Sequence, residues 1–516
     1  MKTLWRFCLG LLPGLMLTAT CVLLLQTERV EAAATAQVKK RPPVYMRNQI
    51  IAMGTLSDLA KVEVFYGTQF NLKTMRQTSA SYFTKLTPAI RDQQLPPGFV
   101  PRSTFFLPSE WPKLSTNVIA IGTGATPDQV IAVIRANSAF SRVLVSRDYI
   151  VANDWGIIAD PKWWGGGSPY VTATLPATPT LYTQQFVQLG AFGMTPLSGS
   201  PRPYPFSGKN ANIVLLDTSP FSVTTGTTAL RDYYGIPVSV THPALTDIPT
   251  NVITSPLYIP GHGLFAAGLA HVIAPDANLA MYRVLNDQGL GTESDVFSAL
   301  NTYSNTFGGN TVMNLSFSMM NGDDTIPITD PLAVTLNVIA GLGTTVVAAA
   351  GNDSDTGPAK EMNFPASNSY VLGTAAANAQ GKRACYSNTA TFSGTKKGVG
   401  APGGEGDMSD GTCQPPTNYV CINDPLCLVT SWWHPSLPPS MTFGAGTSFA
   451  APFASGTAAL AIERFNVLSE TISIYKVPQW IISYTKPTDP QLGYGIINLG
   501  DMFLPKRTYL PIATKQ

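Results

Sequence analysis

Short apolar runs alternate with helical patterns between about residues 211 and 378, and this alternation constrains the fold more than any other feature. The runs are ANIVLLD, NLAMYRVL, TVMNLSF, TTVVAAAG and YVLGTAAAN. Each is bounded by turn residues, as is typical of strands buried on both faces of a sheet. Between them, GHGLFAAGLAHVI, ESDVFSALNTYSN and TDPLAVTLNVIAGLG predict helices, the last with Asp330 as its N-cap. The sequence therefore predicts an α/β fold with a mostly parallel, doubly wound sheet.

The length of 516 residues allows two or three domains. Residues 37–160 predict a small α+β region, because strand, helix and strand patterns follow one another in NVIAIGTGATPDQVIAVIRANSAFSRVLVSRDYIVAND. Residues 161–183 are rich in Gly, Pro and Thr and predict an exposed linker. The α/β domain is expected over residues 184–505, followed by a tail, residues 506–516.

The N-terminus has the layout of a secretory signal. Lys2 and Arg6 precede an apolar run from Phe7 to Leu25, and small residues follow at 32–36. The run is longer than a usual signal core and approaches the length that spans a bilayer. Residues 1–36 therefore predict a cleaved signal peptide, with an uncleaved membrane anchor as the alternative. In either case the bulk of the protein is expected outside the cytoplasm.

Cysteine usage agrees with export. The cysteines downstream of the N-terminal segment are Cys385, Cys413, Cys421 and Cys427. An even number in an exported chain predicts one or two disulfides, whose pairing stays open. A zinc site is disfavoured, because the sequence has no CxxC pair and no histidine at ligand spacing. The net charge of +2 gives no indication of a nucleic-acid partner.

Four polar residues lie where a parallel sheet forms its sites, at strand ends and helix starts. Asp217 ends ANIVLLD, and His262 lies between two glycines in PGHGLFAAG. Asn352 follows TTVVAAAG, and Ser448 lies in GAGTSFAAP, where an apolar helix begins. Each has an ordinary structural alternative: a turn aspartate, a helix-start histidine, a turn asparagine and an N-cap serine.

Together these residues supply the parts of acyl transfer by a serine. His262 can take the hydroxyl proton of Ser448, and Asp217 can hold the imidazole in the required tautomer. The amide of Asn352 can donate to the oxyanion. The order Asp, His, Ser along the chain is one of the orders in which such triads occur.

The region from about Gln184 to Phe503 resembles the catalytic domain of subtilisin-like serine peptidases. NIVLLDTS, GHGLFAAG, VVAAAGND and GTSFAAPFASG resemble the family's Asp, His, Asn and Ser stretches, in the family's order. The resemblance implies a secreted endopeptidase that hydrolyses peptide bonds through an acyl-enzyme on Ser448. Asn352 and the N–H of Ser448 would then form the oxyanion hole.

The resemblance also implies substrate contacts and a partner. The substrate-binding residues would be Ser316, Phe317, Ser318, Ala349, Ala350 and Gly351. By position and pattern, residues 37–160 resemble the family's inhibitory propeptide, which predicts a prosegment acting as intramolecular inhibitor or chaperone of a monomeric enzyme. No cofactor is required. The family often binds structural calcium, but no calcium loop can be assigned in this sequence.

Departures from the family pattern bear on specificity and rate more than on mechanism. Phe453 replaces a usual histidine, and Ser318 stands where a pocket wall usually has glycine. Two alternatives stay open: a catalytically silent homologue that binds peptides or acts as a scaffold, and an acid peptidase of the sedolisin type with Glu in place of His. The intact set of four residues argues against the first, and His262 argues against the second.

Overall fold

The protein is described from a computed structural model. The structure describes residues 45–79, 114–153, 173–174, 205–218, 226–231, 237–243, 261–287, 289–319, 326, 329–354, 359–378, 380–405, 429–433, 440–470 and 476–503. The predicted signal segment, the C-terminal tail and all of the linker except residues 173–174 lie outside these ranges. Within them, no helix combines the length and the apolar character needed to cross a bilayer.

A ten-stranded sheet forms the larger part of the structure, in the order β20-β21-β17-β14-β13-β11-β6-β9-β8-β7. All neighbours from β21 to β8 are parallel, and the two edge pairs are antiparallel. The strands are β6 Asn212–Asp217, β7 Gly226–Arg231, β8 Pro237–His242, β9 Asn278–Arg283, β11 Thr311–Leu315, β13 Thr345–Ala349, β14 Val371–Ala377, β17 Val399–Pro402, β20 Thr485–Lys486 and β21 Ile496–Ile497. The predicted parallel sheet is confirmed.

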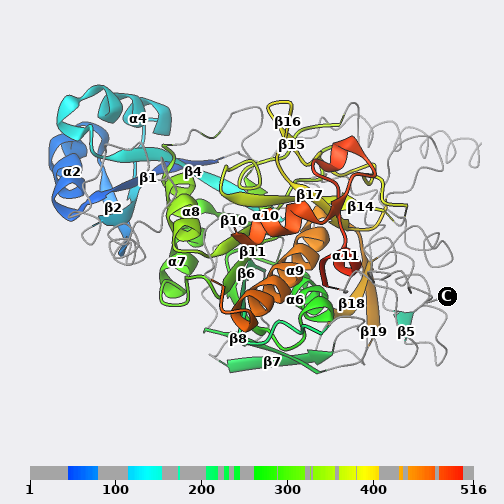
Figure 1. The fold of residues 1–516 in the computed structure, drawn as a ribbon. Coiled ribbons are helices and arrows are strands. Elements are labelled where there is room, and N and C mark those ends of the chain that lie inside the picture. Colours follow the sequence, from blue (N-terminus) through cyan, green and yellow to red (C-terminus); the bar gives the residue numbers. More distant parts are fainter. Residues whose placement is uncertain are drawn as a thin grey trace, which may run out of the picture. The chain divides into compact units, whose positions relative to one another are not determined.

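Helices cover both faces of this sheet. They are α6 His262–Ile273, α7 Glu293–Thr302, α8 Pro331–Gly341, α9 Thr447–Val467, α10 Lys476–Ser483 and α11 Leu499–Phe503. Ile213 and Leu215 of β6 share an apolar core with α6 and α9, which lie side by side in Figure 1. Val214 and Leu216 point into a second core with α7 and α8. Because successive side chains alternate between faces, β6 is apolar at nearly every position.

Capping residues set where the helices of the second face begin. Asp330 is the N-cap of α8, and its side chain accepts a hydrogen bond from the N–H of Leu332 at 2.9 Å. Pro331 occupies the first helical position, where its missing N–H costs nothing. The predicted start of this helix is therefore confirmed. Thr292 and Asp295 form a capping box at the start of α7.

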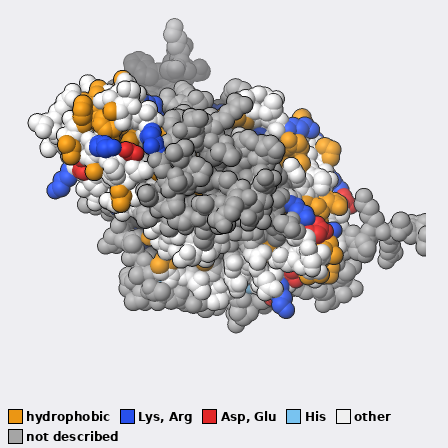
Figure 2. Space-filling model, turned by 60° about the vertical axis from the view of Figure 1, so that its left-hand side comes forward, with side chains coloured by type: hydrophobic (Ala, Val, Ile, Leu, Met, Phe, Trp, Pro, Cys, Tyr) orange, Lys and Arg blue, Asp and Glu red, His pale blue; other side chains and the backbone are white. Residues whose placement is uncertain are grey.

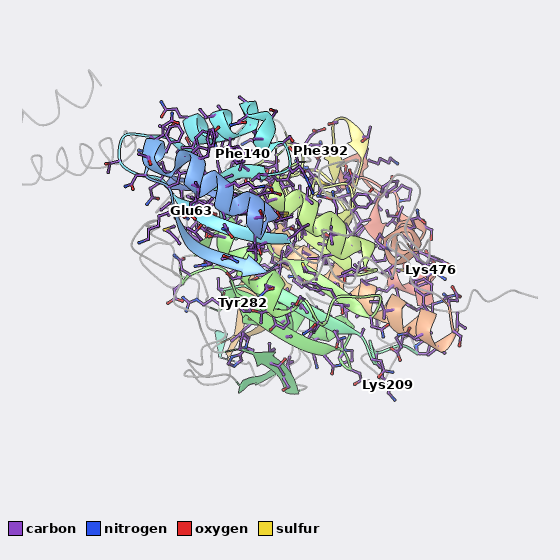
Figure 3. The ribbon with its side chains drawn as sticks, turned by 90° about the vertical axis from the view of Figure 1, so that its left-hand side faces the viewer. Glu63, Phe140, Lys209, Tyr282, Phe392 and Lys476 are labelled. Atoms are coloured by element: carbon purple, nitrogen blue, oxygen red, sulfur yellow. The ribbon has the colours of Figure 1, made fainter. Side chains whose placement is uncertain are left out.

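The N-terminal region contributes a second, antiparallel sheet covered by helices on one face. Its elements are β1 Tyr45–Thr55, α2 Leu56–Phe70, β2 Lys73–Ser79, β3 Leu114–Ala120, α4 Pro127–Ala136, η2 Ser138–Phe140 and β4 Leu144–Asn153. The elements β3, α4 and β4 match the predicted strand, helix and strand, whereas β1, α2 and β2 were not identified in the sequence. Phe140 lies between α2 and α4, with its ring 5.5 Å from the ring of Tyr66 (Figure 3).

Two strands of the α/β domain extend this second sheet. β10, Leu290–Thr292, and β12, Phe317–Met319, each pair antiparallel with β4. Strand β1 is buried on both faces: Ile50 and Ala52 pack with α2 and α4, whereas Ile51 and Met53 join the core that contains α7 and α8. The N-terminal region and the α/β domain therefore share one sheet and one apolar core.

Small sheets complete the described structure. β15, Thr391–Phe392, pairs with β16, Thr395–Lys396. β18, Val429–Trp433, pairs with β19, Ser440–Gly444, which also pairs with β5, Ala173–Thr174. A 3-10 turn, η4, spans Pro490–Leu492. Strand β5 lies within the predicted linker, so these two residues are paired where the sequence predicts an unpaired segment.

Three carboxyl groups are buried between the N-terminal region and the α/β domain. They differ from the charged side chains in Figure 2, which are scattered over the surface. Asp148 lies on β4, Glu293 begins α7 and Asp330 caps α8, and all three are fully buried. Asp148 accepts hydrogen bonds from the side chain of Gln49 and, at 3.0 Å, from the N–H of Ser294.

Burial raises the pKa of all three carboxyls because the charged form loses its hydration. The pKa of Asp148 rises to about 7 and that of Asp330 to about 6, and the pKa of Glu293 is raised well above its usual range. The charge of Asp295 raises the pKa of Asp148 further, and Arg76 lies 3.3 Å from the Asp295 carboxylate. We therefore expect the stability of the interface between the two regions to depend on pH.

The sign of this sensitivity follows from the raised values. A carboxyl whose pKa is higher in the folded chain stabilises the fold fully below about pH 4, and that contribution is lost as the pH rises through the folded value. We expect Asp148→Asn, which cannot ionise, to increase stability at pH 8 relative to the parent by on the order of 2 to 4 kcal/mol, with little change at pH 4.

Thermal unfolding at both pH values measures this difference, with Ser448→Ala in both chains to remove the peptidase activity that the sequence predicts. Asp276→Asn, which alters an exposed carboxylate, is the matched control and should leave the pH dependence unchanged. An Asp148→Asn chain with the same pH dependence as its parent would show that the buried carboxyl does not control docking of the N-terminal region.

Candidate active site

The parallel strands bring the predicted residues to one edge of the large sheet. β6, β11 and β13 are neighbours in register, with Leu216 opposite Leu315 and Leu315 opposite Ala348. Asp217 ends β6, and Asn352 follows β13 by three residues. Helices α6 and α9 begin at His262 and Thr447. Since the carboxyl ends of parallel strands form such sites, the geometry matches the predicted position.

Asp217 and His262 form a hydrogen bond between fully buried side chains. Nδ1 of His262 lies 2.7 Å from Oδ1 of Asp217, and neither residue is exposed. The N–H of Thr218 donates to the same carboxylate oxygen at 2.7 Å. Within the described structure, Oδ2 of Asp217 and Nε2 of His262 have no hydrogen-bond partner. The bond to Nδ1 fixes the ring orientation and leaves Nε2 available to accept a proton.

Gly263 makes the approach of α6 to β6 possible. A Cβ atom at this position would lie 2.9 Å from Cβ of Asp217 and 3.0 Å from Sδ of Met281. The N–H of Gly263 also donates to the hydroxyl of Thr218 at 3.1 Å. The glycine on the C-terminal side of His262 therefore makes room for the aspartate.

Ser448 is the second residue of α9 and does not cap it. The N-cap is Gly446, and no side-chain hydrogen bond caps this helix. The hydroxyl of Ser448 is fully buried and has no hydrogen-bond partner among the described residues. The ring of the next residue, Phe449, lies 5.1 Å from the ring of His262. The N-cap alternative for Ser448 is therefore wrong. Its hydroxyl lies in the turn of α9 that contacts the imidazole through Phe449, and no hydrogen bond joins it to Nε2 of His262.

Asn352 lies beside the start of α9 and is held by its carbonyl oxygen. Oδ1 of Asn352 accepts a hydrogen bond from the N–H of Thr447 at 3.0 Å. The hydroxyl of Thr447 in turn accepts from the N–H of Gly351 at 3.2 Å. Because the carbonyl end of the amide is committed to Thr447, its NH₂ end is left to donate elsewhere.

A buried network of amide groups, which the sequence did not reveal, supports the loop that follows β13. Gly351 has φ +110°, and a Cβ there would lie 2.4 Å from Nδ2 of Asn388. Nδ2 of Asn388 donates to the carbonyl of Ala350 at 3.2 Å and to Asp353 at 3.1 Å. Oδ1 of Asn388 accepts from the N–H of Asp353 at 3.0 Å. These bonds fix both sides of Asn352.

The predicted substrate-binding residues lie along the same edge of the large sheet, but those in β12 are already paired with another strand. Ala349 ends β13, and Ala350 and Gly351 follow it, all buried. Phe317 and Ser318 lie in β12, where they pair with Asn153 and Ala152 of β4. The N-terminal region thus lies along the strand that the sequence assigns to substrate.

Cys385 is disulfide-bonded in the structure. Cys413, Cys421 and Cys427 lie outside the described residues, so the pairing stays a prediction. In the part of the chain that the structure describes, no three His, Cys, Asp or Glu side chains are grouped so as to hold a metal ion. The structural calcium that the resemblance allows therefore stays unassigned.

The comparison with protein families identifies the domain. Residues 255–495 match the model of the subtilase family. The chain carries a subtilase domain. The matched range includes His262, Asn352 and Ser448, whereas Asp217 precedes it. The assignment of Asp217 to the site therefore rests on its hydrogen bond to His262.

Known subtilases cover part of the chain. Subtilisin DY of Bacillus licheniformis is 27% identical over 218 residues, which are 40% of this chain and 66% of that protein. Subtilisin E of Bacillus subtilis (strain 168) is 27% identical over 195 residues, 37% of this chain and 40% of that protein. The chain thus spans from about two fifths to just under two thirds of the length of these relatives.

One solved structure resembles nearly the whole chain in fold. Fervidolysin from Fervidobacterium pennivorans, described as a keratinolytic enzyme related to subtilisin, matches with a TM-score of 0.53. The match covers 91% of this chain and 62% of that chain at 16% identity. This likeness supports the subtilisin-like fold and carries no statement about substrate.

Substitution of Gly263 tests the geometry of the buried pair. We expect Gly263→Ala to destabilise the chain by about 1 to 3 kcal/mol, because the new methyl group must displace Asp217 or Met281. The low-field proton resonance of the bond between Nδ1 and Asp217 should weaken or shift. Gly308→Ala, where a Cβ has no neighbour within 4 Å, is the matched control and should behave as the parent. Equal stability and equal spectra in both variants would contradict the close approach.

Proposed function

We propose that the protein is a secreted serine endopeptidase whose catalytic residues are Asp217, His262 and Ser448. The proposal is supported most directly by the buried 2.7 Å bond between Asp217 and His262. In addition, Nε2 of His262 and the hydroxyl of Ser448 have no hydrogen-bond partner among the residues that the structure describes. Buried polar groups are nearly always hydrogen-bonded, so two unpaired groups at one site favour a reactive role. The subtilase domain supports peptide bonds as the substrate class.

In each half of the proposed reaction, His262 first accepts a proton and then donates it. Nε2 of His262 takes the proton of Ser448 as Oγ attacks the carbonyl carbon of the peptide bond, and then gives it to the leaving amine. Asp217 holds Nδ1–H and stabilises the imidazolium that forms. Water then attacks the acyl-enzyme by the same route, which frees the acid product and restores Ser448. No cofactor is required.

The oxyanion of the tetrahedral intermediate needs donors placed in advance. The NH₂ end of Asn352 can supply one, because its carbonyl end is bound to Thr447. The N–H of Ser448 can supply another, since it belongs to the first turn of α9, where N–H groups have no helical acceptor. The positive end of the helix dipole favours the same charge.

We further propose that the N-terminal region is a prosegment that blocks the substrate site. Strand β4 lies between β10 and β12 and pairs with both, so that Ala152 is opposite both Leu290 and Ser318. An extended segment that adds to exposed strand edges in this way occupies the position of a peptide substrate. The buried interface with α7 and α8 holds the prosegment there.

The register of β4 bears on the site of maturation. The last paired residue of β4, Asn153, is opposite Phe317, which directly follows Ser316, and the hydroxyl of Ser316 is bonded to the carbonyl of Ser448. This proximity favours a cut soon after Asn153. The linker composition instead predicts a cut between about Gly165 and Gly190, a range of which the structure describes only residues 173–174.

Purified chains with and without Ser448 test the proposal. The parent should separate into an N-terminal fragment and a mature enzyme that cleaves casein, with the new N-terminus close after Asn153. Ser448→Ala should keep its full length after any signal peptide is removed, and it should not cleave casein. If both chains show the same fragments and neither cleaves casein, the catalytically silent homologue becomes the better account. An N-terminus in the Gly165–Gly190 range would favour the linker over the register.

A substitution of Asn352 tests the proposed oxyanion hole separately. Asn352→Ala should lower kcat of the mature enzyme by roughly 100- to 1000-fold, because one donor to the oxyanion is lost. KM for a peptide substrate should change little, since the bond forms mainly in the transition state. A kcat within a factor of three of the parent would remove Asn352 from the oxyanion hole.

A further inference from the structure

A chain of three buried hydrogen bonds links the strand β11 to the nucleophile's helix. The hydroxyl of Ser455 donates to Oδ1 of Asn314 at 2.9 Å, and Nδ2 of Asn314 donates to the hydroxyl of Ser316 at 2.8 Å. The hydroxyl of Ser316 then donates to the backbone carbonyl of Ser448 at 2.8 Å. All four residues are fully buried. The sequence singled out only Ser316 and Ser448 among them.

Pro452 explains why the carbonyl of Ser448 needs this donor. In an α-helix the carbonyl of residue 448 accepts from the N–H of residue 452. Residue 452 is proline, which lies inside α9 and has no N–H. The hydroxyl of Ser316 therefore supplies the hydrogen bond that the helix itself cannot make. A buried carbonyl without a donor would destabilise the fold by about 1 to 3 kcal/mol.

The amide of Asn314 fixes the direction of this bond. A serine hydroxyl can rotate and has one proton. Because Nδ2 of Asn314 donates to the Ser316 oxygen, the Ser316 proton is directed toward Ser448. Ser455 holds the other end of the amide and so fixes its orientation. The hydrogen bonds therefore all run in one direction, from α9 through β11 and back to α9.

We propose that Ser316 and Asn314 are positioning residues that set Ser448 relative to the substrate strand. Ser316 lies between β11 and β12, and the next residue, Phe317, begins the strand that pairs with β4. A bond from Ser316 to the backbone of Ser448 thus joins the residue that attacks to the strand that holds the peptide. This role rests on the proposed peptidase function and concerns a contact beyond the triad and the oxyanion donors.

The proposal predicts a loss in kcat when the link is cut. Ser316→Ala should lower kcat of the mature enzyme roughly tenfold or more, because small displacements of a reacting group are costly in rate. KM should stay within about threefold, since the backbone of the substrate strand is kept. Asn314→Leu should show the same split between kcat and KM. Thr457→Val is the matched control: it removes a buried hydroxyl from α9 that, among the described residues, bonds only to the carbonyl of Phe453.

A second variant separates positioning from stability. Pro452→Ala returns an N–H to α9, so that in the double variant Ser316→Ala/Pro452→Ala the carbonyl of Ser448 regains a helical donor. The double variant should recover stability relative to Ser316→Ala, measured by thermal unfolding, while kcat stays low because the link to the strand is still absent. Recovery of kcat together with stability would overturn the positioning role.

Parallel measurement of Ser448→Ala distinguishes the two proposals. If Ser448→Ala is inactive and Ser316→Ala has the kcat of the parent, only the positioning role fails. If Ser448→Ala is as active as the parent, the proposed catalytic site fails and the positioning role with it. A lowered kcat in Thr457→Val equal to that of Ser316→Ala would also overturn the proposal, since any lost hydroxyl in α9 would then have the same effect.

Discussion

The parallel register of β6, β11 and β13 is the constraint on which the site depends. Because these strands run in one direction and are paired in register, their carboxyl ends meet at one edge. The three strands end at or just before Asp217, Ser316 and Asn352, so the register fixes the spacing of these residues. A strand shifted by one residue would turn its apolar side chains to the opposite face, so both apolar cores hold the register. The stability of the sheet and the geometry of the site therefore have the same origin.

The second requirement is close contact between the helices that carry His262 and Ser448. Gly456 of α9 lies against α6, where a Cβ would be 2.7 Å from Cβ of Ile273 and 2.8 Å from the carbonyl of Ala270. The small residues of both helices allow their axes to approach, and the two helix N-termini then lie at the same edge. Gly263 serves the same purpose between α6 and β6. Small residues at these contacts, rather than polar bonds alone, determine where the imidazole lies relative to the hydroxyl.

The sequence predicted what local pattern can reveal. The apolar runs identified the strands, and the motifs around Asp217, His262 and Ser448 identified the residues that the structure brings together. It could not reveal Asn314 as the partner of Ser316 and Ser455, because a polar residue inside a strand has no local sign of a contact 141 residues away. Nor could it reveal that Asp148 is buried against α7, since that depends on how the N-terminal sheet joins the α/β domain. Pairings between distant segments are set by tertiary packing, which a local sequence pattern does not reveal.

The most direct measurement of the central claim is covalent labelling of the mature enzyme with a fluorophosphonate. An activated serine forms an Oγ–P bond and releases fluoride, and an ordinary serine does not react at a comparable rate. We predict one adduct, located on Ser448 by mass spectrometry of the digested protein, and its loss in His262→Ala. An adduct on another serine, labelling that persists in His262→Ala, or no adduct in a chain that cleaves casein would contradict the assignment of Asp217, His262 and Ser448 as the catalytic triad.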